Sequence, residues 1–361
     1  MIVADFRMNK IYFFPKYSSK APSSRYRIYE YLPYYQQAGI KFIVSPLLGD
    51  WYLSALWGHK SKFRVLFLII VTYLKRIASV LFIPHNSIVY IGAELLPYMP
   101  SWLESYLHFR GIKYLIEFDD AVFHNYENKN IIIRKLYREK FRKVISKASL
   151  VICGCRYLAD YSKQWNKNVL IIPTSIDKNK YNKTISCTNN IIGWIGSSTT
   201  SPNIKIVIPA LKKLSEEFNF ELHLIGFDKK YEYLLNGINY RLIDWTSETE
   251  VSELSQFTIG IMPLYDTPGN RGKCAFKLVQ YMAVGIPTIS TPLQSNIDID
   301  KKCGNLFANT EEEWYIAFKD LLFNPDRRNQ VGNNNKRVAM QHYTFQSNSQ
   351  KIIGSLKMIS G

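Results

Sequence analysis

Residues 272–290 read GKCAFKLVQYMAVGIPTIS and decide the fold class of this chain. Just before them, residues 257–263 (FTIGIMP) form an apolar run of strand length, and a loop with adjacent proline and glycine follows it. The pattern predicts a helix that begins near Cys274 and ends at Gly285, since glycine often closes a helix and the proline two positions later cannot continue it. A second strand then starts at residue 288, so the stretch completes a βαβ unit.

The start of this helix predicts an anion-binding site. In open α/β sheets, ligands bind beyond the carboxyl ends of the parallel strands, where a helix N-terminus offers free N–H groups to phosphate. Arg271 and Lys273 lie at that end, and basic residues there oppose the helix dipole, so they favour an anionic ligand. Lys277 and Gln280 are three residues apart and share one helix face. Solvated surface charge is the alternative for any single lysine, but the position of the cluster favours phosphate.

Length, charge and cysteine usage limit the classes of protein to consider. The chain has 361 residues, more than one ordinary core holds, so two domains are expected. A net charge of +17 indicates attraction to nucleic acid, an anionic membrane or phosphorylated substrates. The five cysteines have neither zinc-finger nor disulfide spacing, which favours a reducing compartment. The first residues contain no apolar stretch of signal-peptide length, so we do not expect export.

The most apolar window runs over residues 63–83. Its uncharged core has only ten residues, 65–74, whereas a helix needs about 20 to span a bilayer, so no transmembrane helix is expected. The window could instead lie on a membrane surface, with packing against a sheet as the alternative. Basic residues surround it, namely Lys60, Lys62, Arg64, Lys75 and Arg76.

Two series of strand-like runs alternate with helical stretches, which predicts parallel sheets covered by helices. The first series occupies residues 11–14, 41–45, 87–91, 114–118, 150–153 and 169–172, and the second 191–195, 221–225, 240–243, 257–262 and 288–290. Residues 178–190 between them are polar and aperiodic, as in a linker. We therefore expect an α/β protein with two doubly wound domains, at 1–180 and 181–344. The tail predicts helices broken near residues 324–325 and 342–345, and we expect the last one, 345–361, to pack back on the first domain.

Seven sequence blocks in a fixed order carry a resemblance to a known family. They are APSSRYRIYEYLPYYQQAGI (21–40), IGAELLPYMPSWLE (91–104), YLIEFDDAVFHNY (114–126), VLIIPTSIDKNKY (169–181), IIGWIGSSTT (191–200), IGIMPLYD (259–266) and KLVQYMAVGIPTIS (277–290). Together they resemble GT-B glycosyltransferases, in particular the family 4-like "glycosyl transferases group 1" branch that builds bacterial cell-surface polysaccharides. The resemblance covers most of the chain, and several ordered matches are far more specific than one glycine-rich motif.

The resemblance implies a fold, a reaction and a location. The fold would be two Rossmann-like domains that face a cleft. The reaction would move a sugar, hexosyltransferase-like, from a nucleotide diphosphate sugar to a hydroxyl of a surface glycan or lipid-linked acceptor, with retention of configuration and with neither a metal nor another cofactor. The protein would be cytoplasmic and peripheral on the inner face of the cell membrane, with an anionic membrane surface as a partner.

Candidate donor-binding residues lie in the second half of the chain. The turn after the strand at 191–195 can meet a diphosphate through its hydroxyl and N–H groups, although a plain helix cap uses the same groups. Relatives often place two glutamates eight positions apart near the later helix, the second one on the donor ribose. This chain has Gly272 and Gln280 there, so only an amide remains, and we expect a carboxylate at position 280 to be tolerated. Trp245 is a candidate for contact with the base, with a core role as the alternative. The donor-binding candidates are Gly196, Ser197, Ser198, Arg271, Lys273, Lys277 and Gln280.

Candidate acceptor residues lie in the first half. Asp119 and Asp120 follow a predicted strand and are the candidate catalytic residues, because paired acids can position or deprotonate an acceptor hydroxyl. A turn or helix cap and a metal site are the alternatives. The resemblance favours a role for these acids on the acceptor over a metal site, because enzymes of this fold usually neutralise the phosphate charge with lysine and arginine. Glu94 and His124 are candidates to face the acceptor, and Arg25 to reach a phosphate. Their alternatives are a helix cap, an incidental surface histidine and a surface salt bridge.

Two other function classes are considered. A nucleic-acid-binding protein would explain the charge, but the basic residues are dispersed and do not form a stripe with interleaved aromatics, so nucleic acid is not expected as a partner. A catalytically inactive glycan-assembly partner with the same fold would explain why positions 272 and 280 lack carboxylates. Turnover of the donor separates that class from an enzyme.

Overall fold

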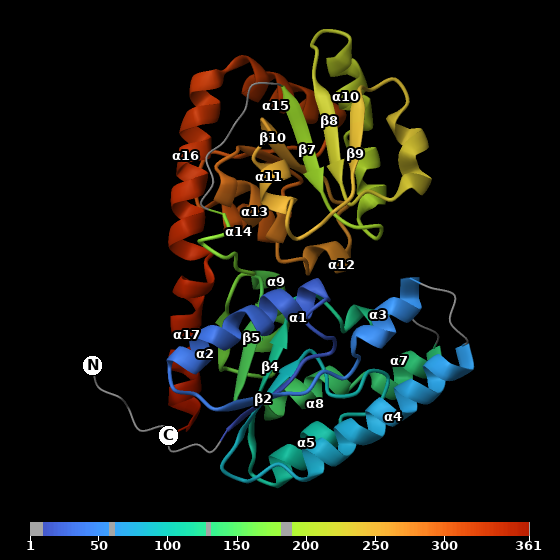
Figure 1. Ribbon diagram of the computed structural model, residues 1–361, viewed down its shortest axis with the longest axis vertical. Coiled ribbons are helices and arrows are strands. Elements are labelled where there is room, and N and C mark those ends of the chain that lie inside the picture. The colour runs from blue at the N-terminus through green and yellow to red at the C-terminus, as the bar shows by residue number, and fades with distance from the viewer. Residues whose placement is uncertain (1–9, 58–61, 128–130, 182–189, 361) are drawn as a thin grey trace. The chain divides into compact units, whose positions relative to one another are not determined.

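The computed structural model describes residues 10–57, 62–127, 131–181 and 190–360. The chain divides into two compact units, Met1–Thr174 with Asn348–Gly361, and Ser175–Ser347. The last helix, α17 (Phe345–Ser360), begins in the second unit, and its residues from Asn348 onward belong to the first. Each unit is built on one parallel sheet with helices packed beside it (Figure 1).

The first unit contains a six-stranded sheet in the order β2-β1-β3-β4-β5-β6. All neighbouring strands are parallel: β1 (Ile11–Phe14), β2 (Phe42–Val44), β3 (Ile88–Gly92), β4 (Lys113–Phe118), β5 (Leu150–Cys153) and β6 (Val169–Ile171). Every run predicted as a strand in this half forms one, with ends shifted by at most one residue. The chain adds β2 on one side of β1 and β3 on the other, so the strand order switches there, at the point where ligands bind in such sheets.

The helices of the first unit connect these strands. They are α1 (Pro22–Arg27), the short 3-10 helix η1 (Tyr29–Tyr31), α2 (Leu32–Gln37), α3 (Asp50–Trp57), α4 (Lys62–Leu81), α5 (Trp102–Phe109), α6 (His124–Glu127), α7 (Ile131–Tyr137), α8 (Lys140–Lys147) and α9 (Arg156–Lys163). Arg25 lies in the helix α1.

Helix α4 contains the apolar window, and one of its faces packs on the unit. Val80 is fully buried there, and Arg76 is only 2% exposed. The Nη2 of Arg76 donates to the carbonyl of Ser45 at 2.7 Å. Arg76 is therefore not available to a membrane surface, because its helix position turns it toward the chain that leaves β2. Lys60 and the side chain of Lys62 lie outside the described residues, and no described helix is long and apolar enough to cross a membrane.

The second unit contains a six-stranded sheet in the order β12-β11-β10-β7-β8-β9. The strands are again parallel: β7 (Ile191–Ile195), β8 (Glu221–Ile225), β9 (Tyr240–Ile243), β10 (Ile259–Met262), β11 (Thr288–Ser290) and β12 (Leu306–Phe307). The two-residue strand β12 has no counterpart among the predicted runs. The order switches between β7 and β10, so the loops that leave these two strands meet at the ligand-binding edge. The α/β prediction with two doubly wound sheets is confirmed.

Helices cover both faces of the second sheet. They are the 3-10 helices η2 (Ser201–Ile206) and η3 (Lys229–Leu235), and the helices α10 (Ile208–Ser215), α11 (Glu250–Leu254), α12 (Pro268–Arg271), α13 (Phe276–Val284), α14 (Gln294–Asp300), α15 (Glu311–Phe323) and α16 (Pro325–His342). One core cluster includes side chains of α11, α13 and α16, and the other includes side chains of α10 and α15. The predicted breaks in the tail, near 324–325 and 342–345, are confirmed by the ends of α15, α16 and α17.

The decisive βαβ unit forms largely as predicted. Gly285 closes α13 with a φ of 83°, in the left-handed region that glycine adopts without steric cost. The start differs from the expectation, because α13 begins at Phe276 and Ala275 precedes it with a φ of 52°. Arg271 instead ends the short helix α12, and Lys273 lies between α12 and α13. Both basic residues therefore precede the start of α13, Arg271 as the last residue of α12 and Lys273 in the connection between the two helices.

Candidate functional site

The loop that leaves β7 lies directly over the ring of Trp194. A Cβ added at Gly196 would come within 2.2 Å of that ring and 2.7 Å of the Thr200 hydroxyl, so only glycine lets the chain pass this close. The loop then turns back on itself, since the Thr200 Oγ1 accepts from the Ser197 N–H and donates to the Ser197 carbonyl, both at 3.1 Å. Trp194 and Thr200 thus hold a tight exposed turn at the switch point of the sheet.

The tip of this turn carries two free backbone donors. Ser198 and Thr199 are exposed, and their N–H groups have no acceptor in the part of the chain that the structure describes. The hydroxyls of Ser197 and Thr199 lie 3.0 Å apart beside them. Adjacent backbone N–H groups with nearby hydroxyls form an anion-binding arrangement. The alternative role of this turn as a plain helix cap is not supported, because the residue that precedes η2 makes no side-chain hydrogen bond to the first turn of that helix.

Lys277, on the first turn of α13, reaches the same turn. Its Nζ lies 4.3 Å from the Trp194 ring centroid and 3.3 Å from the Thr200 Oγ1. No described carboxylate pairs with it. Burial and, to a smaller extent, the neighbouring ammonium of Lys273 lower the pKa of Lys277 to about 7. A half-buried ammonium without a described acid partner gains most from an anionic ligand, so Lys277 and the turn together are a candidate anion site.

The loop after β10 approaches the same edge. The Tyr265 N–H donates to the Asn203 side chain at 3.3 Å, and Asn203 lies in η2, just after the β7 turn. Arg271 makes a two-point ion pair with Asp266, with Nε–Oδ1 2.6 Å and Nη2–Oδ2 2.9 Å. The guanidinium is therefore held on its own loop, half exposed. Lys273 acts electrostatically on Lys277, as the lowered pKa of Lys277 shows.

Gln280 belongs to a buried polar network below α13. It is 4% exposed, and its Nε2 donates to the Tyr181 hydroxyl at 2.9 Å. Tyr181 in turn donates to the Glu250 Oε1 at 2.7 Å, and Lys180 pairs with the same oxygen at 3.3 Å. The second oxygen of Glu250 accepts from the Trp245 indole at 2.7 Å. Trp245 is 38% exposed, so this contact fixes a half-exposed ring near the carboxyl end of β9 and departs from the fully buried core alternative.

Sequence reasoning missed Glu250 and Tyr181. Glu250 is 2% exposed and Tyr181 1% exposed, yet both precede or follow polar stretches that read as loop or linker. No local pattern marks a glutamate as buried when one of its partners, Tyr181, lies 69 positions away in sequence. The resemblance to a family block that ends at Tyr181 was the one available signal.

In the first unit, Asp119 and Asp120 directly follow the carboxyl end of β4. Asp119 is half buried and Asp120 exposed. The Asp120 Oδ1 accepts from the N–H of the next residue, Ala121, at 2.8 Å, whereas an Asx turn uses the N–H two residues on. Among the residues that the structure describes, no group of three or more His, Cys, Asp or Glu side chains could hold a metal ion.

His124 lies between two polar partners. It begins α6, with its Nδ1 2.5 Å from the Glu127 Oε2 and its Nε2 2.8 Å from the Tyr157 hydroxyl. A carboxylate on one ring nitrogen and a hydroxyl on the other fix the orientation of the imidazole. His124 is thus held in place on both sides, which differs from an incidental surface histidine.

The structure places Glu94 in a buried ion pair. It is 3% exposed, and its Oε2 lies 2.6 Å from both the Lys140 Nζ and the Tyr126 hydroxyl. Glu94 is therefore neither a helix cap nor an exposed side chain that could contact a glycan acceptor. Arg25 is half buried, with its guanidinium 4.7 Å from the ring centroid of Tyr26.

Arg27 and Glu117 form a second buried ion pair, which sequence reasoning also missed. Both are under 5% exposed, with the Arg27 Nε 2.6 Å from the Glu117 Oε1. Arg27 also donates to the Ile172 carbonyl at 2.9 Å, and the Tyr90 hydroxyl donates to the Glu117 Oε2 at 2.6 Å. Burial raises the pKa of Glu117, and Arg27 opposes that shift. The pair ties α1 to β4 and to the chain that leaves β6.

Comparisons with known proteins give a family match for part of the chain and a fold for nearly all of it. Residues 189–324 match the family model described as glycosyl transferases group 1. No curated protein matches the sequence. Several solved structures are similar over 97% of this chain at low sequence identity.

Three of these structures have GT-B architecture. Sucrose-phosphate synthase from Thermosynechococcus elongatus has a TM-score of 0.73 at 10% identity, with 98% of its own chain covered. A glycosyltransferase from Rickettsia africae has 0.70 at 14%, with 99% covered. Anabaena HepE in complex with UDP has 0.68 at 12%, with 100% covered. The chain therefore has the fold of these structures, and residues 189–324, within its second unit, match the glycosyl transferases group 1 model.

Proposed function

We propose that the protein transfers a sugar from a nucleoside diphosphate sugar to a hydroxyl of a surface glycan or lipid-linked acceptor. The observation that carries the proposal is the convergence of Lys277 with the free N–H groups of Ser198 and Thr199 at the switch point of the second sheet. These groups offer a charge and two directed donors to a diphosphate. UDP is the first nucleotide to test, because HepE was solved with UDP and with UDP-glucose.

The proposed reaction needs countercharge for its leaving group. The bond between the sugar C1 and the diphosphate oxygen breaks, a bond from C1 to the acceptor oxygen forms, and the acceptor proton passes to a base or to the leaving diphosphate. Negative charge develops on the diphosphate, so Lys277 and the amides of the β7 turn would stabilise the transition state more than the ground state. Asp119 and Asp120 are the candidates to orient the acceptor hydroxyl or take its proton.

The finer parts of the proposal rest on the resemblance to the family. They are retention of configuration, independence of metal, a role in surface polysaccharide synthesis and a place at the inner face of the cell membrane.

Binding of the donor tests the proposal directly. Thermal shift and calorimetry with UDP-, GDP-, ADP- and dTDP-sugars should find one nucleotide that binds. The Lys277→Met variant should bind that nucleotide about 10- to 150-fold more weakly, since a charge-assisted contact contributes roughly 1.5 to 3 kcal/mol. Lys212→Met, which removes an exposed lysine of α10, is the matched control and should bind normally. Equal affinity of both variants would overturn the site.

An inactive partner with the same fold is the second candidate. This candidate is favoured by the buried position of Gln280, whose amide nitrogen donates a hydrogen bond to the Tyr181 hydroxyl. Such a protein would bind the nucleotide sugar but release no nucleoside diphosphate over time, whether or not glycan acceptors are added. Any acceptor-dependent release that Lys277→Met abolishes rules it out.

A further inference from the structure

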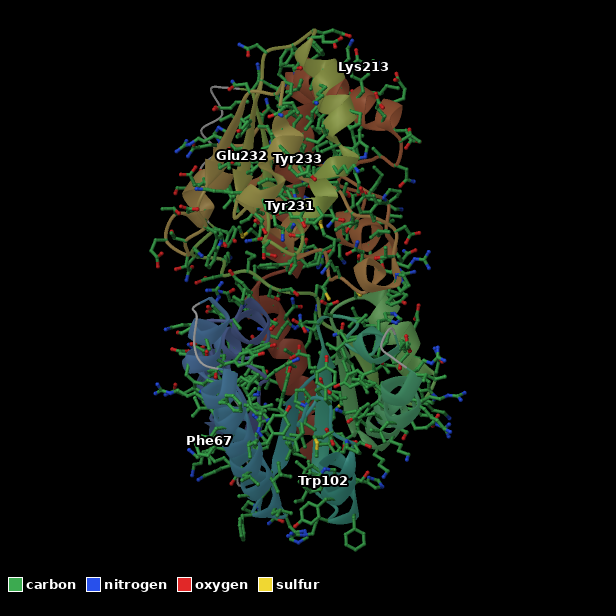
Figure 2. The ribbon with its side chains drawn as sticks, turned by 90° about the vertical axis from the view of Figure 1, so that its right-hand side faces the viewer. Phe67, Trp102, Lys213, Tyr231, Glu232 and Tyr233 are labelled. Carbon is green, nitrogen blue, oxygen red and sulfur yellow. The ribbon has the colours of Figure 1, made fainter. Side chains whose placement is uncertain are left out.

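Helix α4 exposes a row of large apolar side chains. The exposed fractions are 86% for Phe63, 56% for Leu66, 65% for Phe67, 51% for Ile70 and 60% for Leu74. Spacings of three and four residues place all five on one face of the helix. We call these five residues the α4 stripe. Figure 2 shows Phe67 on the outer side of its helix.

The opposite face of α4 is fixed to the first unit. The Arg76 guanidinium donates to the carbonyls of Pro15 and Ser45 at 3.2 and 2.7 Å and stacks over the Phe14 ring. The Tyr73 hydroxyl donates to the Pro97 carbonyl at 2.8 Å. These contacts hold the helix in one rotation about its axis, so the α4 stripe faces away from the unit that carries it.

Exposed aromatic side chains extend the apolar surface at the C-terminal end of α4. Phe82, 84% exposed, directly follows the helix. Phe109 of α5 is 87% exposed, and α5 is joined to this end because the Tyr106 hydroxyl donates to the Leu81 carbonyl at 3.1 Å. Large contiguous apolar surfaces on a folded unit usually mark an interaction site.

The charge around the α4 stripe selects the kind of partner. Residues 62–81 contain no Asp or Glu, and the exposed residues Arg64 and Lys75 border the stripe. An apolar helix face edged with basic residues matches the interface of an anionic bilayer, where acyl chains meet negative headgroups. A second copy of this chain would bring like charges together, since each carries a net charge of +17.

We propose that the α4 stripe docks the protein on an anionic lipid bilayer, with the helix lying in the plane of the interface. Phe63, Phe67 and Leu74 would enter the acyl boundary, and Arg64 and Lys75 would contact the headgroups. The inference rests on the place at the membrane in the proposed function and names the surface that would hold the protein there, and its test depends neither on turnover nor on the donor site.

Flotation with lipid vesicles tests the docking surface. One set of vesicles contains phosphatidylglycerol in phosphatidylcholine, and the other contains phosphatidylcholine alone. The stripe variant is Phe63→Ser, Phe67→Ser and Leu74→Ser. Its matched control replaces three exposed apolar residues of the second unit, and its substitutions are Tyr233→Ser (labelled in Figure 2), Ile297→Ser and Ile316→Ser.

Wild type and control should bind the anionic vesicles, and the stripe variant at least tenfold more weakly. Arg64→Glu with Lys75→Glu should weaken binding roughly 25-fold, at about fivefold per basic residue. High salt should release the wild type. Thermal unfolding and nucleotide binding check that each variant is folded, and the single variant Phe67→Ser replaces the triple variant if that one does not fold.

Three results would overturn the proposal. The first is equal binding of wild type and stripe variant to anionic vesicles. The second is equal binding of the wild type to both kinds of vesicle, which would exclude selection of anionic lipid. The third is no vesicle binding together with a dimer, detected by sedimentation equilibrium, that the stripe variant fails to form. That result would assign the α4 stripe to a second copy of the chain.

Discussion

At the residue scale, the environment of Lys277 predicts how donor affinity depends on pH. Its pKa of about 7 means that the amine is largely neutral above that pH in the free protein, and a bound diphosphate would raise the pKa again. Binding then takes up a proton, so affinity for a nucleotide sugar should fall as pH rises from 6.5 to 8.5, by up to about tenfold per unit. Calorimetry at several pH values checks this, and the slope should vanish in Lys277→Met.

The lowered pKa of Lys277 also makes the stability of the folded protein depend on pH. The unfolded chain, with a lysine pKa of 10.5, binds more protons than the folded chain between about pH 7 and 10.5. The contribution of Lys277 to the free energy of unfolding therefore rises with pH across that window. A wild type whose donor affinity is flat from 6.5 to 8.5 would show that Lys277 is charged before the donor binds.

Gln280→Glu should destabilise the protein. From the sequence alone we expected the change to be tolerated, but the buried contacts reverse that expectation. The Tyr181 proton is directed to Glu250, so a carboxylate at position 280 would lose the donated hydrogen bond and add a second buried negative charge near the first. We expect a loss of about 1 to 3 kcal/mol at pH 7 and a smaller loss at acidic pH, where the new carboxyl is protonated.

Urea unfolding of Gln280→Glu at both pH values measures this loss. Gln256→Glu, at a half-buried site beside α11, provides a control in the same unit. Wild-type stability of Gln280→Glu together with tighter nucleotide binding would restore the sequence-based expectation and assign the side chain to the ribose.

Asp119→Asn and Asp120→Asn should separate binding from turnover. Asp120 already accepts a hydrogen bond from the backbone of its own turn, whereas Asp119 is half buried beside the strand end. The residue that faces the acceptor should lose turnover by 100-fold or more, on the order expected for a general base, with donor affinity unchanged. Normal turnover by both variants would assign the two acids to the turn.

At the element scale, a buried ion pair anchors the six-residue helix α1. Such a short helix has little stability of its own, so its tertiary contacts decide whether it forms. Glu117→Gln would leave Arg27 charged and buried without an acid partner, and we expect it to cost about 3 to 5 kcal/mol of unfolding free energy. Asp160→Asn, at an exposed surface pair, should cost under about 1 kcal/mol.

A double variant distinguishes loss of the charge pair from loss of packing. Arg27→Met combined with Glu117→Gln removes the unpaired charge, so it should be more stable than Glu117→Gln alone. If the double variant is less stable than the single one, then the contacts of Arg27 to the backbone after β6 outweigh its charge.

At the scale of the whole molecule, the charge balance bears on metal dependence. The chain carries 46 Lys and Arg against 29 Asp and Glu, so positive side chains are abundant as countercharge for a leaving diphosphate. We expect sugar transfer to continue after treatment with a chelator. Turnover assays with EDTA, with and without added Mg²⁺, provide the measurement. Activity lost with the chelator and restored by Mg²⁺ would instead require a metal in the reaction.

The sequence by itself determined the architecture. Alternating apolar runs and turn residues predicted eleven strands with nearly correct ends, because period and punctuation are local properties of the chain. The missed strand, β12, has two residues and therefore no periodicity to detect. Gly285 was also predicted from local sequence as the end of α13, since a helix end in the left-handed conformation favours glycine at that position.

The partners of the polar side chains were decided only by the tertiary structure. Lys277 meets Thr200 across 77 residues, Gln280 meets Tyr181 across 99, and Arg27 meets Glu117 across 90. Sequence spacing placed Lys277 and Gln280 on one helix face, yet one reaches the exposed turn and the other a buried network. Arg76 and Lys75 are adjacent and equally basic, but the packing of α4 buries one and exposes the other. Burial and pairing depend on which elements pack together, and that information lies in contacts between distant segments.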